Sequence, residues 1–404
     1  MHILVLTPVF PNPSSPSEGL FNEQHARALN AAGVKVTILV CKPWLPGKLA
    51  KSWPRYHSLA YLPLKEEREE FPVLYARYLH IPRYQWANLT VASCASAILK
   101  RVQRLYSFEP FDLIHVHSTW PVGLAAPMIT PALRCPFVLT MHIQDDPRLY
   151  SSQSGGKLYR RMLERASAVV GVGHPLESFI QEFMPDLPEK QFRIIPNGVD
   201  LKTIHGVLEC TPRNRNDWGH IVSIGNPWPC KGLDLNLRAL GKMSGDRIPW
   251  KSFTIVGEGP EQPRLKRLAQ ELGIADRVHF KGRMSHRDAL QEIVKADIFS
   301  LPSWQEAFGV VYLEAMACGK PVLGCWGQGA EDIIRNEEDG LLVKPRDVED
   351  LGAALRRLVE NAEFARQLGR SGQSRAQEFT WEQNAAQYLE LYREVCSTVK
   401  LGYP

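Results

Sequence analysis

The strongest constraint on the fold is the regular alternation of short apolar runs with longer helical stretches. Ile3–Leu6 has the pattern of a buried strand, Asn22–Ala32 that of a helix ended by Gly33, and Val34–Val40 that of the next strand. This strand–helix–strand order is typical of parallel sheets joined by crossover helices. The alternation continues with strands predicted at Leu113–His117, Phe137–Met141 and Ala168–Val172. We therefore expect a doubly wound α/β domain in the first half of the chain.

The same alternation starts again after the turn-rich segment Pro196–Asp200. Strands are predicted there at His220–Ile224, Ser252–Val256, Val278–Phe280, Ile298–Leu301 and Pro321–Gly324. We predict two Rossmann-like domains, at 1–200 and 201–380, and a last helix within 381–404 that crosses back to the first domain. Parallel α/β sheets bind ligands outside the carboxyl ends of their strands, so two facing domains would enclose a ligand cleft.

Composition excludes several classes of protein. The chain has 404 residues, of which 44% are hydrophobic and 23% charged, as in ordinary globular proteins. No apolar run reaches the ~18 residues that a membrane span needs, and the start carries no basic leader, so we expect a cytoplasmic protein. The eight scattered cysteines form no C-x-x-C pair and are expected to be reduced thiols.

Positive charge is concentrated in the first half of the chain. Residues 1–205 hold 22 Lys and Arg against 16 Asp and Glu. Such an excess fits an anionic membrane surface, a phosphate-bearing acceptor or no particular partner. Peripheral contact with the inner face of the plasma membrane is one hypothesis, and a solvated helix face around Arg160 and Arg161 is the other. No basic block with interleaved aromatic residues occurs, so no nucleic-acid partner is expected.

Two glycine motifs resemble nucleotide fingerprints but lack the third glycine. Gly171 and Gly173 follow a predicted strand, as do Gly257 and Gly259, but the third glycine of G-x-G-x-x-G is replaced by Leu176 in one case and Gln262 in the other. No Walker A loop is present. Nicotinamide chemistry and P-loop phosphate hydrolysis are therefore disfavoured.

The most informative segment spans residues 303–322 and holds two glutamates, Glu306 and Glu314. A strand precedes it, Gly309 lies in a turn, and a short helix follows. The first turn of such a helix offers free N–H groups to an anion, and glycine lets a ligand approach the backbone. Carboxylates on both sides of a phosphate-binding turn suit a ligand with sugar, diphosphate and ribose parts. The alternative is an amphipathic helix with two solvated glutamates.

This segment resembles the E-x7-E signature of the retaining glycosyltransferases of family 4, the group 1 enzymes with the GT-B fold. Further segments resemble the family's motifs in the same order. They are Ser17–Phe21, His115–Ser118, Thr140–His142, Pro196–Asp200, Val256–Glu261, Ala296–Ser303 and the helix from Trp381. The opening segment also resembles bacterial cell-surface polysaccharide enzymes such as the teichuronic-acid glycosyltransferases.

The resemblance implies roles for individual residues. Glu306 would hold hydroxyls of the transferred sugar and Glu314 the ribose of the nucleotide, and His142 would lie at the sugar. Gly19 would let the first-domain loop approach the diphosphate. Backbone amides would contact the sugar and the diphosphate at Phe308, Gly309 and Val310. For His142 the alternative is a histidine at a strand end that is bonded only to backbone.

One motif departs from the family pattern. The family usually reads G-R-L-x-x-x-K-G where this chain has Gly225–Gly232, so Lys231 is kept and Asn226 replaces the arginine. Asparagine carries no charge and cannot make a bidentate fork. Stabilisation of the leaving group would fall on Lys231 and the helix end, or Arg283 would assist.

Metal dependence is not expected. His115 and His117 lie on one side of a strand and could begin a metal site, but no third ligand has a persuasive spacing, so packing or acceptor contact is preferred. The sequence contains no D-x-D pair, which metal-dependent glycosyltransferases of the other major fold use. Fixed positive charge and a helix dipole would take its place.

The resemblance thus implies a retaining, metal-independent hexosyltransferase without a cofactor. The donor would be a UDP- or GDP-sugar, and the acceptor a hydroxyl of a glycan or lipid-linked molecule in bacterial surface polysaccharide biosynthesis. The catalytic set would be Glu306, His142 and Lys231. Two alternatives use the same fold, namely a sugar-nucleotide epimerase and a non-catalytic sugar-nucleotide-binding protein.

Overall fold

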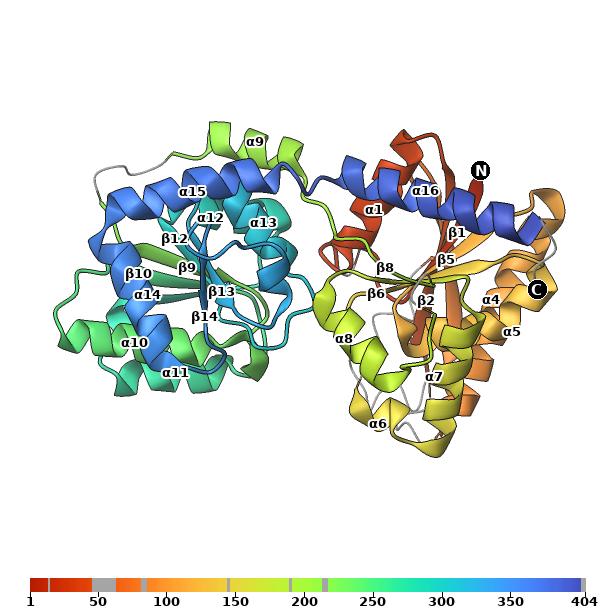
Figure 1. Ribbon diagram of the computed structural model, residues 1–404, viewed down its shortest axis with the longest axis horizontal. Coiled ribbons are helices and arrows are strands. Elements are labelled where there is room, and N and C mark those ends of the chain that lie inside the picture. Colours follow the sequence, from red (N-terminus) through yellow and green to blue (C-terminus); the bar gives the residue numbers. More distant parts are fainter. Residues whose placement is uncertain are drawn as a thin grey trace. The chain divides into compact units, whose positions relative to one another are not determined.

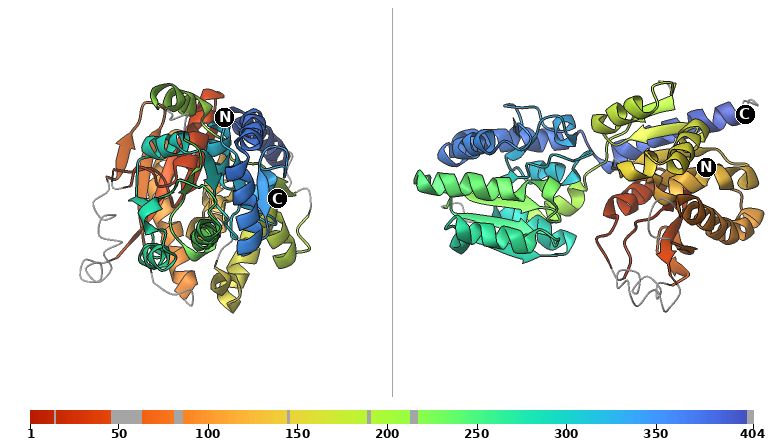
Figure 2. Two further views of the ribbon diagram at one scale, coloured as in Figure 1. Left: turned by 90° about the vertical axis from the view of Figure 1, so that its left-hand side faces the viewer. Right: turned by 90° about the horizontal axis from the view of Figure 1, so that it is seen from below.

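The chain folds into two compact units, each built on its own sheet. The computed structural model describes residues 1–13, 15–45, 63–80, 86–143, 146–188, 191–212 and 217–400. Unit 1 comprises Met1–Pro196 with Trp381–Pro404, and unit 2 comprises Asn197–Thr380. The first strand and the last helix, red and dark blue in Figures 1 and 2, therefore belong to the same unit.

Unit 1 contains an eight-stranded sheet in the order β3-β4-β2-β1-β5-β6-β7-β8. All neighbouring strands are parallel except β3, which runs antiparallel to β4 at one edge. The strands are β1 (His2–Thr7), β2 (Lys35–Trp44), β3 (Lys65–Glu67), β4 (Pro72–Leu79), β5 (Leu113–His117), β6 (Phe137–Met141), β7 (Ala168–Gly171) and β8 (Phe192–Ile194). The chain order reverses between β1 and β5, the switch point at which doubly wound sheets bind ligands.

Helices cover this sheet, and the last one comes from the C-terminal end of the chain. They are α1 (Leu20–Ala31), α4 (Ala87–Phe108), α5 (Leu124–Leu133), α6 (Pro147–Tyr150), α7 (Gln153–Arg165), α8 (His174–Phe183), α16 (Trp381–Lys400) and the π-helical turn η3 (Thr119–Gly123). α16 lies beside α1 (Figure 1), and its Tyr388 and Tyr392 are buried in one hydrophobic cluster with Ile3, Val5 and Leu29. Burial of these side chains fixes α16 to unit 1.

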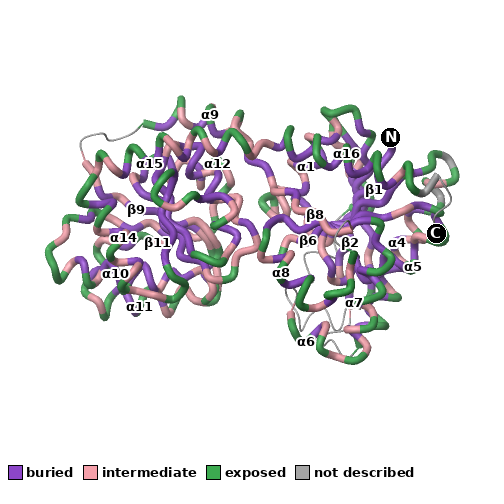
Figure 3. Tube along the Cα trace, in the orientation of Figure 1, coloured by how far each residue is buried: buried purple, intermediate pink, exposed green. Residues whose placement is uncertain are grey.

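Unit 2 contains a fully parallel six-stranded sheet in the order β11-β10-β9-β12-β13-β14. The strands are β9 (His220–Ile224), β10 (Ser252–Val256), β11 (Val278–Gly282), β12 (Ile298–Ser300), β13 (Val322–Cys325) and β14 (Leu341–Val343). Its switch point lies between β9 and β12. The strands form the buried interior of the unit, coloured purple in Figure 3.

The helices of unit 2 pack as two groups. α10 (Leu233–Gly245) packs against α11 (Gln262–Glu271) and α14 (Val348–Glu360). The other group contains α9 (Leu201–Cys210), α12 (His286–Lys295), α13 (Val310–Ala317) and α15 (Ala362–Ala376). The described part of the unit also contains short 3₁₀ turns, η5 (Pro229–Lys231), η6 (Ala275–Arg277) and η7 (Gly329–Asp332).

The expected fold class, doubly wound parallel α/β sheets, is confirmed. The strands at β3, β4, β8 and β14 were not predicted. β3 and β8 are three-residue strands at sheet edges that read Lys-Glu-Glu and Phe-Arg-Ile, so neither is an uninterrupted apolar run. β4 begins at Pro72, one residue after the charged run of residues 65–70, and Arg77 interrupts its apolar residues.

Candidate functional site

Two loops of unit 2 meet at its switch point. The loop after β9 ends with Lys231, and the loop after β12 contains Glu306. Lys231 Nζ donates to Glu306 Oε2 at 2.6 Å, and the two side chains are 22% and 16% exposed. Trp304 N also donates to the carbonyl of Cys230 at 2.9 Å, so the loops are joined by backbone as well. A cation and a carboxylate are thus held together where doubly wound sheets bind ligands.

The turn before α13 is shaped by Gly309. This residue has φ 93° and is the N-cap of α13 without any side-chain cap. A Cβ here would lie 2.6 Å from the ring of Tyr312, so only glycine fits. The helix therefore starts at Val310 with first-turn N–H groups that no capping side chain occupies, which is the arrangement that favours anions.

A neighbouring segment holds this turn in place. Gly329 N donates to the carbonyl of Glu306 at 2.8 Å, and Gln328 Oε1 accepts from Glu306 N at 3.2 Å. Phe308 is buried, and a Cβ on Gly329 would lie 2.3 Å from its amide nitrogen. The backbone around Glu306 is therefore fixed by the protein itself.

Glu314 lies one turn into α13 and is paired with a residue that the sequence analysis did not single out. His286, the first residue of α12, has Nε2 2.7 Å from Glu314 Oε1. Burial alone would lower the pKa of His286, but its hydrogen bond to Glu314 and the charges of Glu314 and Asp200 outweigh burial and raise it. No motif marks His286, because the contact depends on how α12 and α13 pack.

The loop that carries Asn226 rests on the Gly257–Gly259 segment. A Cβ on Gly257 would lie 2.2 Å from the carbonyl oxygen of Gly225, and one on Gly259 would lie 2.6 Å from that of Pro227. These glycines therefore support the Asn226 loop rather than form a dinucleotide fingerprint. Asn226 itself accepts from Trp228 N at 2.8 Å through its backbone carbonyl.

Arg283 follows β11 at the edge of the sheet, two strands from β9. Its guanidinium Nε lies 3.5 Å from Glu258 Oε2, and both side chains are well exposed. The structure thus brings Lys231 and Glu306 into contact, whereas Arg283 pairs with a different carboxylate.

Gly19 occupies the loop between β1 and α1 in unit 1. It is the N-cap of α1 with φ 67°, and a Cβ there would lie 2.5 Å from the carbonyl oxygen of Val9. The protein's own backbone therefore already demands glycine at this position. Next to it, Glu18 Oε2 accepts from the buried Lys42 Nζ at 2.9 Å, which anchors the loop to β2.

His142 follows β6 and joins a group of buried histidines. Its ring stacks on His117 with centroids 5.2 Å apart, and its Nε2 lies 2.9 Å from His117 Nδ1. Burial lowers the pKa of His142 to about 3. Spacing suggested no third histidine beside His115 and His117, but His25 of α1 brings a ring nitrogen within 4.8 Å of one on each. His25 and His115 are 90 residues apart in the sequence, so no motif spacing could indicate their contact.

Comparison of the chain with known proteins identifies its family. Residues 21–203 match the family described as Glycosyltransferase Family 4, and residues 213–375 match that described as Glycosyl transferases group 1. A D-inositol 3-phosphate glycosyltransferase of Saccharomonospora viridis is 38% identical over 348 residues, covering 80% of each chain. The chain belongs to the group 1 glycosyltransferases of family 4. The resemblance found in the sequence motifs is thereby confirmed.

Other glycosyltransferases match over nearly the whole length. A Bacillus subtilis protein named for teichuronic acid biosynthesis, TuaC, is 27% identical over 366 residues, which are 88% of this chain and 89% of that protein. The crystal structure of Anabaena HepE with UDP has a TM-score of 0.72 at 19% identity, covering 98% of this chain and 100% of that one. HepE has also been solved with UDP-glucose. The structural likeness shows that this glycosyltransferase has the GT-B fold.

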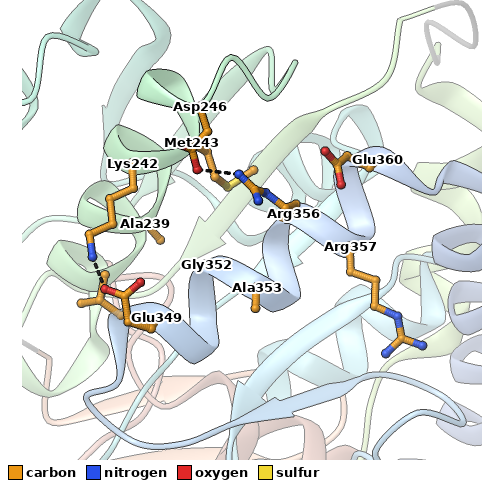
Figure 4. A pocket seen from close by; sticks show the side chains of 11 residues that line it. Ala239, Lys242, Met243, Asp246, Glu349, Gly352, Ala353, Arg356, Arg357 and Glu360 are labelled. Carbon is orange, nitrogen blue, oxygen red and sulfur yellow. Dashed lines mark hydrogen bonds and ion pairs between the residues drawn. The ribbon is translucent and has the colours of Figure 1, made fainter.

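A hollow of about 420 Å³ lies elsewhere in unit 2 of this glycosyltransferase, between α10 and α14 (Figure 4). Two ion pairs span it: Lys242 pairs with Glu349, and Arg356 Nη2 lies 2.5 Å from Asp246 Oδ2. None of the residues expected to bind the donor lines it. Four of its six charged side chains are thus matched within the hollow.

Within the described ranges, no helix is both long and apolar enough to cross a bilayer.

Proposed function

We propose that this glycosyltransferase transfers a hexosyl group from a nucleotide diphosphate sugar to an acceptor hydroxyl, with retention of anomeric configuration and without a metal ion. The observation that carries the proposal is the Lys231–Glu306 pair beside the uncapped start of α13. The pair places a cation that would bind a diphosphate next to a carboxylate that would bind sugar hydroxyls. A helix N-terminus adds positive potential at the same place.

Each part of the donor has proposed partners. Lys231 and the amides of Phe308, Gly309 and Val310 would hold the diphosphate, with Asn226 donating a hydrogen bond and Arg283 adding charge. Glu306 would bind sugar hydroxyls and Glu314, held by His286, the ribose. Gly19 and His142 of unit 1 would contact the diphosphate and the transferred sugar. The complexes of HepE with UDP and UDP-glucose support a UDP-sugar as donor, with a GDP-sugar as the alternative.

The proposed reaction requires no group beyond the two substrates. The acceptor oxygen bonds to the anomeric carbon on the face where the bond to the diphosphate oxygen breaks. The acceptor proton passes to the leaving phosphate oxygen. The products are the new glycoside and the nucleoside diphosphate, and Lys231 with the α13 amides stabilises the charge that develops on the leaving group.

The proposed acceptor is a glycan or lipid-linked molecule of bacterial surface polysaccharide biosynthesis. The match to a teichuronic acid biosynthesis glycosyltransferase supports this class. We also propose peripheral contact with the inner face of the plasma membrane through α7. Lys157, Arg160, Arg161 and Arg165 are exposed on this helix, whereas Tyr159 is buried.

A donor screen followed by product analysis tests the proposal. Thermal shifts are measured with UDP, GDP, ADP and their sugars, because the true donor should stabilise the fold by mass action. The best donor is then incubated with glycan acceptors in EDTA, and NMR gives the anomeric configuration of the product. An inverted product would contradict retention, and loss of activity in EDTA would contradict metal independence. Epimerised donor without acceptor would indicate an epimerase, and binding without transfer or hydrolysis a non-catalytic protein.

Flotation with anionic phospholipid vesicles tests the membrane contact separately. We expect the protein to float at low salt, and to be released at about 0.5 M salt, where the Debye length falls to a few ångströms. The Arg160→Glu/Arg161→Glu variant should not float. Binding that is insensitive to both changes would contradict the proposed contact.

A further inference from the structure

Four histidines gather in unit 1 at the ends of β5 and β6. His25 comes from α1, His115 and His117 from β5, and His142 from the residue after β6. The His25 ring stands at 5.2 Å from those of His115 and His117, and His117 stacks on His142 at 5.2 Å. The first three are at most 2% exposed. We call these four residues the histidine cluster.

A residue of the last helix determines which ring nitrogen of His25 carries hydrogen. Asn384 of α16 donates through Nδ2 to the carbonyl of Pro196 at 2.7 Å, so its Oδ1 is the atom that faces His25 Nδ1, also at 2.7 Å. An amide oxygen only accepts, so His25 Nδ1 must carry a hydrogen. Burial lowers the pKa of His25 to about 4, which leaves the ring neutral at pH 7. Its Nε2 is then a bare lone pair, buried and without a hydrogen-bond partner among the described residues.

The lone pair on His25 Nε2 constrains the tautomer of His117. His117 Nε2 is likewise buried and has no partner in the described part of the chain. With its proton on Nδ1, His117 would add a second bare Nε2 to the cluster, and both acceptors would be buried without a donor. With its proton on Nε2, it supplies the missing donor toward His25 through one bridging water, because ring nitrogens of the two residues lie within 4.8 Å of each other. The second arrangement satisfies more of the buried groups.

The tautomer of His117 then determines that of His142. A bare His117 Nδ1 can only accept, so His142 Nε2, 2.9 Å away, must donate to it. A neutral His142 that carries its proton on Nε2 has a lone pair on Nδ1. This Nδ1 has no partner among the described residues.

A metal ion is the competing interpretation of the cluster, and two observations disfavour it. Both nitrogens of His115 are already occupied: Nε2 lies 2.7 Å from Thr140 Oγ1, and Nδ1 lies 2.6 Å from the hydroxyl of Tyr392. Among the described residues, no acidic side chain is hydrogen-bonded to any of the four rings. A divalent ion would therefore be buried without a compensating negative charge.

We propose that Asn384 is a positioning residue for His142. Through His25 and His117 it holds His142 in the tautomer that carries hydrogen on Nε2 and a lone pair on Nδ1. This inference rests on the proposed function, in which His142 meets the transferred sugar. His142 Nδ1 is buried in the structure, so donor binding must uncover it; a bare Nδ1 then accepts a hydrogen bond from a sugar hydroxyl, whereas Nδ1–H would compete as a donor. Asn384 thereby sets the tautomer of a residue that is not among its hydrogen-bond partners, His25 and Pro196.

The tautomer itself is the primary measurement. Long-range ¹H–¹⁵N correlation spectra of ¹⁵N-histidine-labelled protein show which ring nitrogen carries hydrogen, and single histidine-to-glutamine variants assign the signals. We expect His25 with hydrogen on Nδ1, and His117 and His142 with hydrogen on Nε2. Hydrogen on Nδ1 of His142 would overturn the proposal. So would metal bound to the purified protein that is lost in His25→Gln and His117→Gln.

Matched variants on α16 test the role of Asn384. Asn384→Leu removes the acceptor and should give a mixed His142 tautomer, with kcat lowered about tenfold, the factor that one lost hydrogen bond can cause. Tyr388→Phe, one turn along, removes only the hydroxyl 2.8 Å from Thr140 Oγ1 and should change neither.

The outcomes separate this inference from the proposed function. A Tyr388→Phe variant that shifts the tautomer as Asn384→Leu does would mean general loosening of the cluster and would overturn the role of Asn384. Normal turnover of His142→Ala, with the expected tautomers present, would instead contradict the proposed contact of His142 with the sugar. The tautomer measurement needs neither donor nor acceptor.

Discussion

Lys231 and Glu306 form a 2.6 Å ion pair between loops that follow two neighbouring strands, β9 and β12. The pair lies at the switch point of the unit 2 sheet and is partly exposed. In the proposed reaction, each partner exchanges some of its contact with the other for a contact with the donor. Before the donor binds, each charge keeps the other in place.

Replacing either partner should therefore affect activity far more than folding. We expect Lys231→Met and Glu306→Gln each to lower kcat about 10²- to 10³-fold, the usual loss when one preorganised group at a developing charge is removed. The free energy of unfolding should change by less than about 1 kcal/mol, as for other partly exposed ion pairs. Steady-state kinetics and urea unfolding measure the two effects.

A matched control exists in the same unit. Lys242 and Glu349 form an exposed ion pair across the hollow between α10 and α14 (Figure 4). Lys242→Met and Glu349→Gln should leave kcat unchanged. If both pairs gave the same small change in kcat, the Lys231–Glu306 site assignment would be wrong.

The pair of His286 with Glu314 predicts a pH-dependent contribution to stability. The pKa of His286 is raised above 6.5 in the folded protein, so the folded state binds its proton more tightly than the unfolded state. Its stabilising contribution is complete below pH 6.5 and is lost as pH rises through the raised pKa. Urea unfolding at pH 6 and pH 9 should show His286→Gln less stable than the natural protein at pH 6 and nearly equal at pH 9.

The same variant should also weaken nucleotide binding, because Glu314 would lose the partner that orients it toward the proposed ribose. Calorimetric titration with the preferred nucleoside diphosphate at pH 6 measures this effect. Equal affinity together with an unchanged pH dependence of stability would show that the 2.7 Å contact has no consequence in solution.

Glycines at the two ends of α1 allow a backbone prediction with an internal control. Gly19 and Gly33 both have positive φ, 67° and 84°, so alanine is strained at either position by about 1–2 kcal/mol. A Cβ at Gly19 would also lie 2.5 Å from the Val9 carbonyl oxygen, whereas one at Gly33 meets no atom within 4 Å. Gly19→Ala should therefore destabilise the protein more than Gly33→Ala in thermal unfolding. Equal losses would mean that the β1–α1 loop shifts at little cost to accept a side chain.

The sequence predicted most of the central strands and the two glutamates but not the contacts that orient them. Short buried strands such as β1 and β5 have clear apolar patterns, and Glu306 and Lys231 belong to motifs of fixed spacing. His286 and His25 were missed because their partners, Glu314 and His117, come from other elements. Such contacts depend on helix packing, which neither hydrophobic period nor local motif encodes. The sequence already excluded Gly257 and Gly259 as a nucleotide fingerprint, but it did not show that they support the Asn226 loop, because that role depends on the close approach of two loops.

The buried histidines predict loss of stability in mild acid. Burial lowers the pKa of His25 to about 4 and that of His142 to about 3, and it also lowers those of His115 and His117. Below pH 6.5 the unfolded chain binds protons at these histidines, whereas the folded protein does not. Stability therefore falls as pH falls. For His25 alone the loss amounts to roughly 3 kcal/mol by about pH 4.

Urea unfolding at pH 7, 6 and 5 should show a progressive decrease in the free energy of unfolding. In His25→Gln, the slope of the free energy of unfolding against pH should be smaller by the equivalent of about one bound proton. His205→Gln, at an exposed position on α9, should leave this slope unchanged. Equal slopes in all three proteins would show that His25 is protonated, or accessible to water, in the folded state.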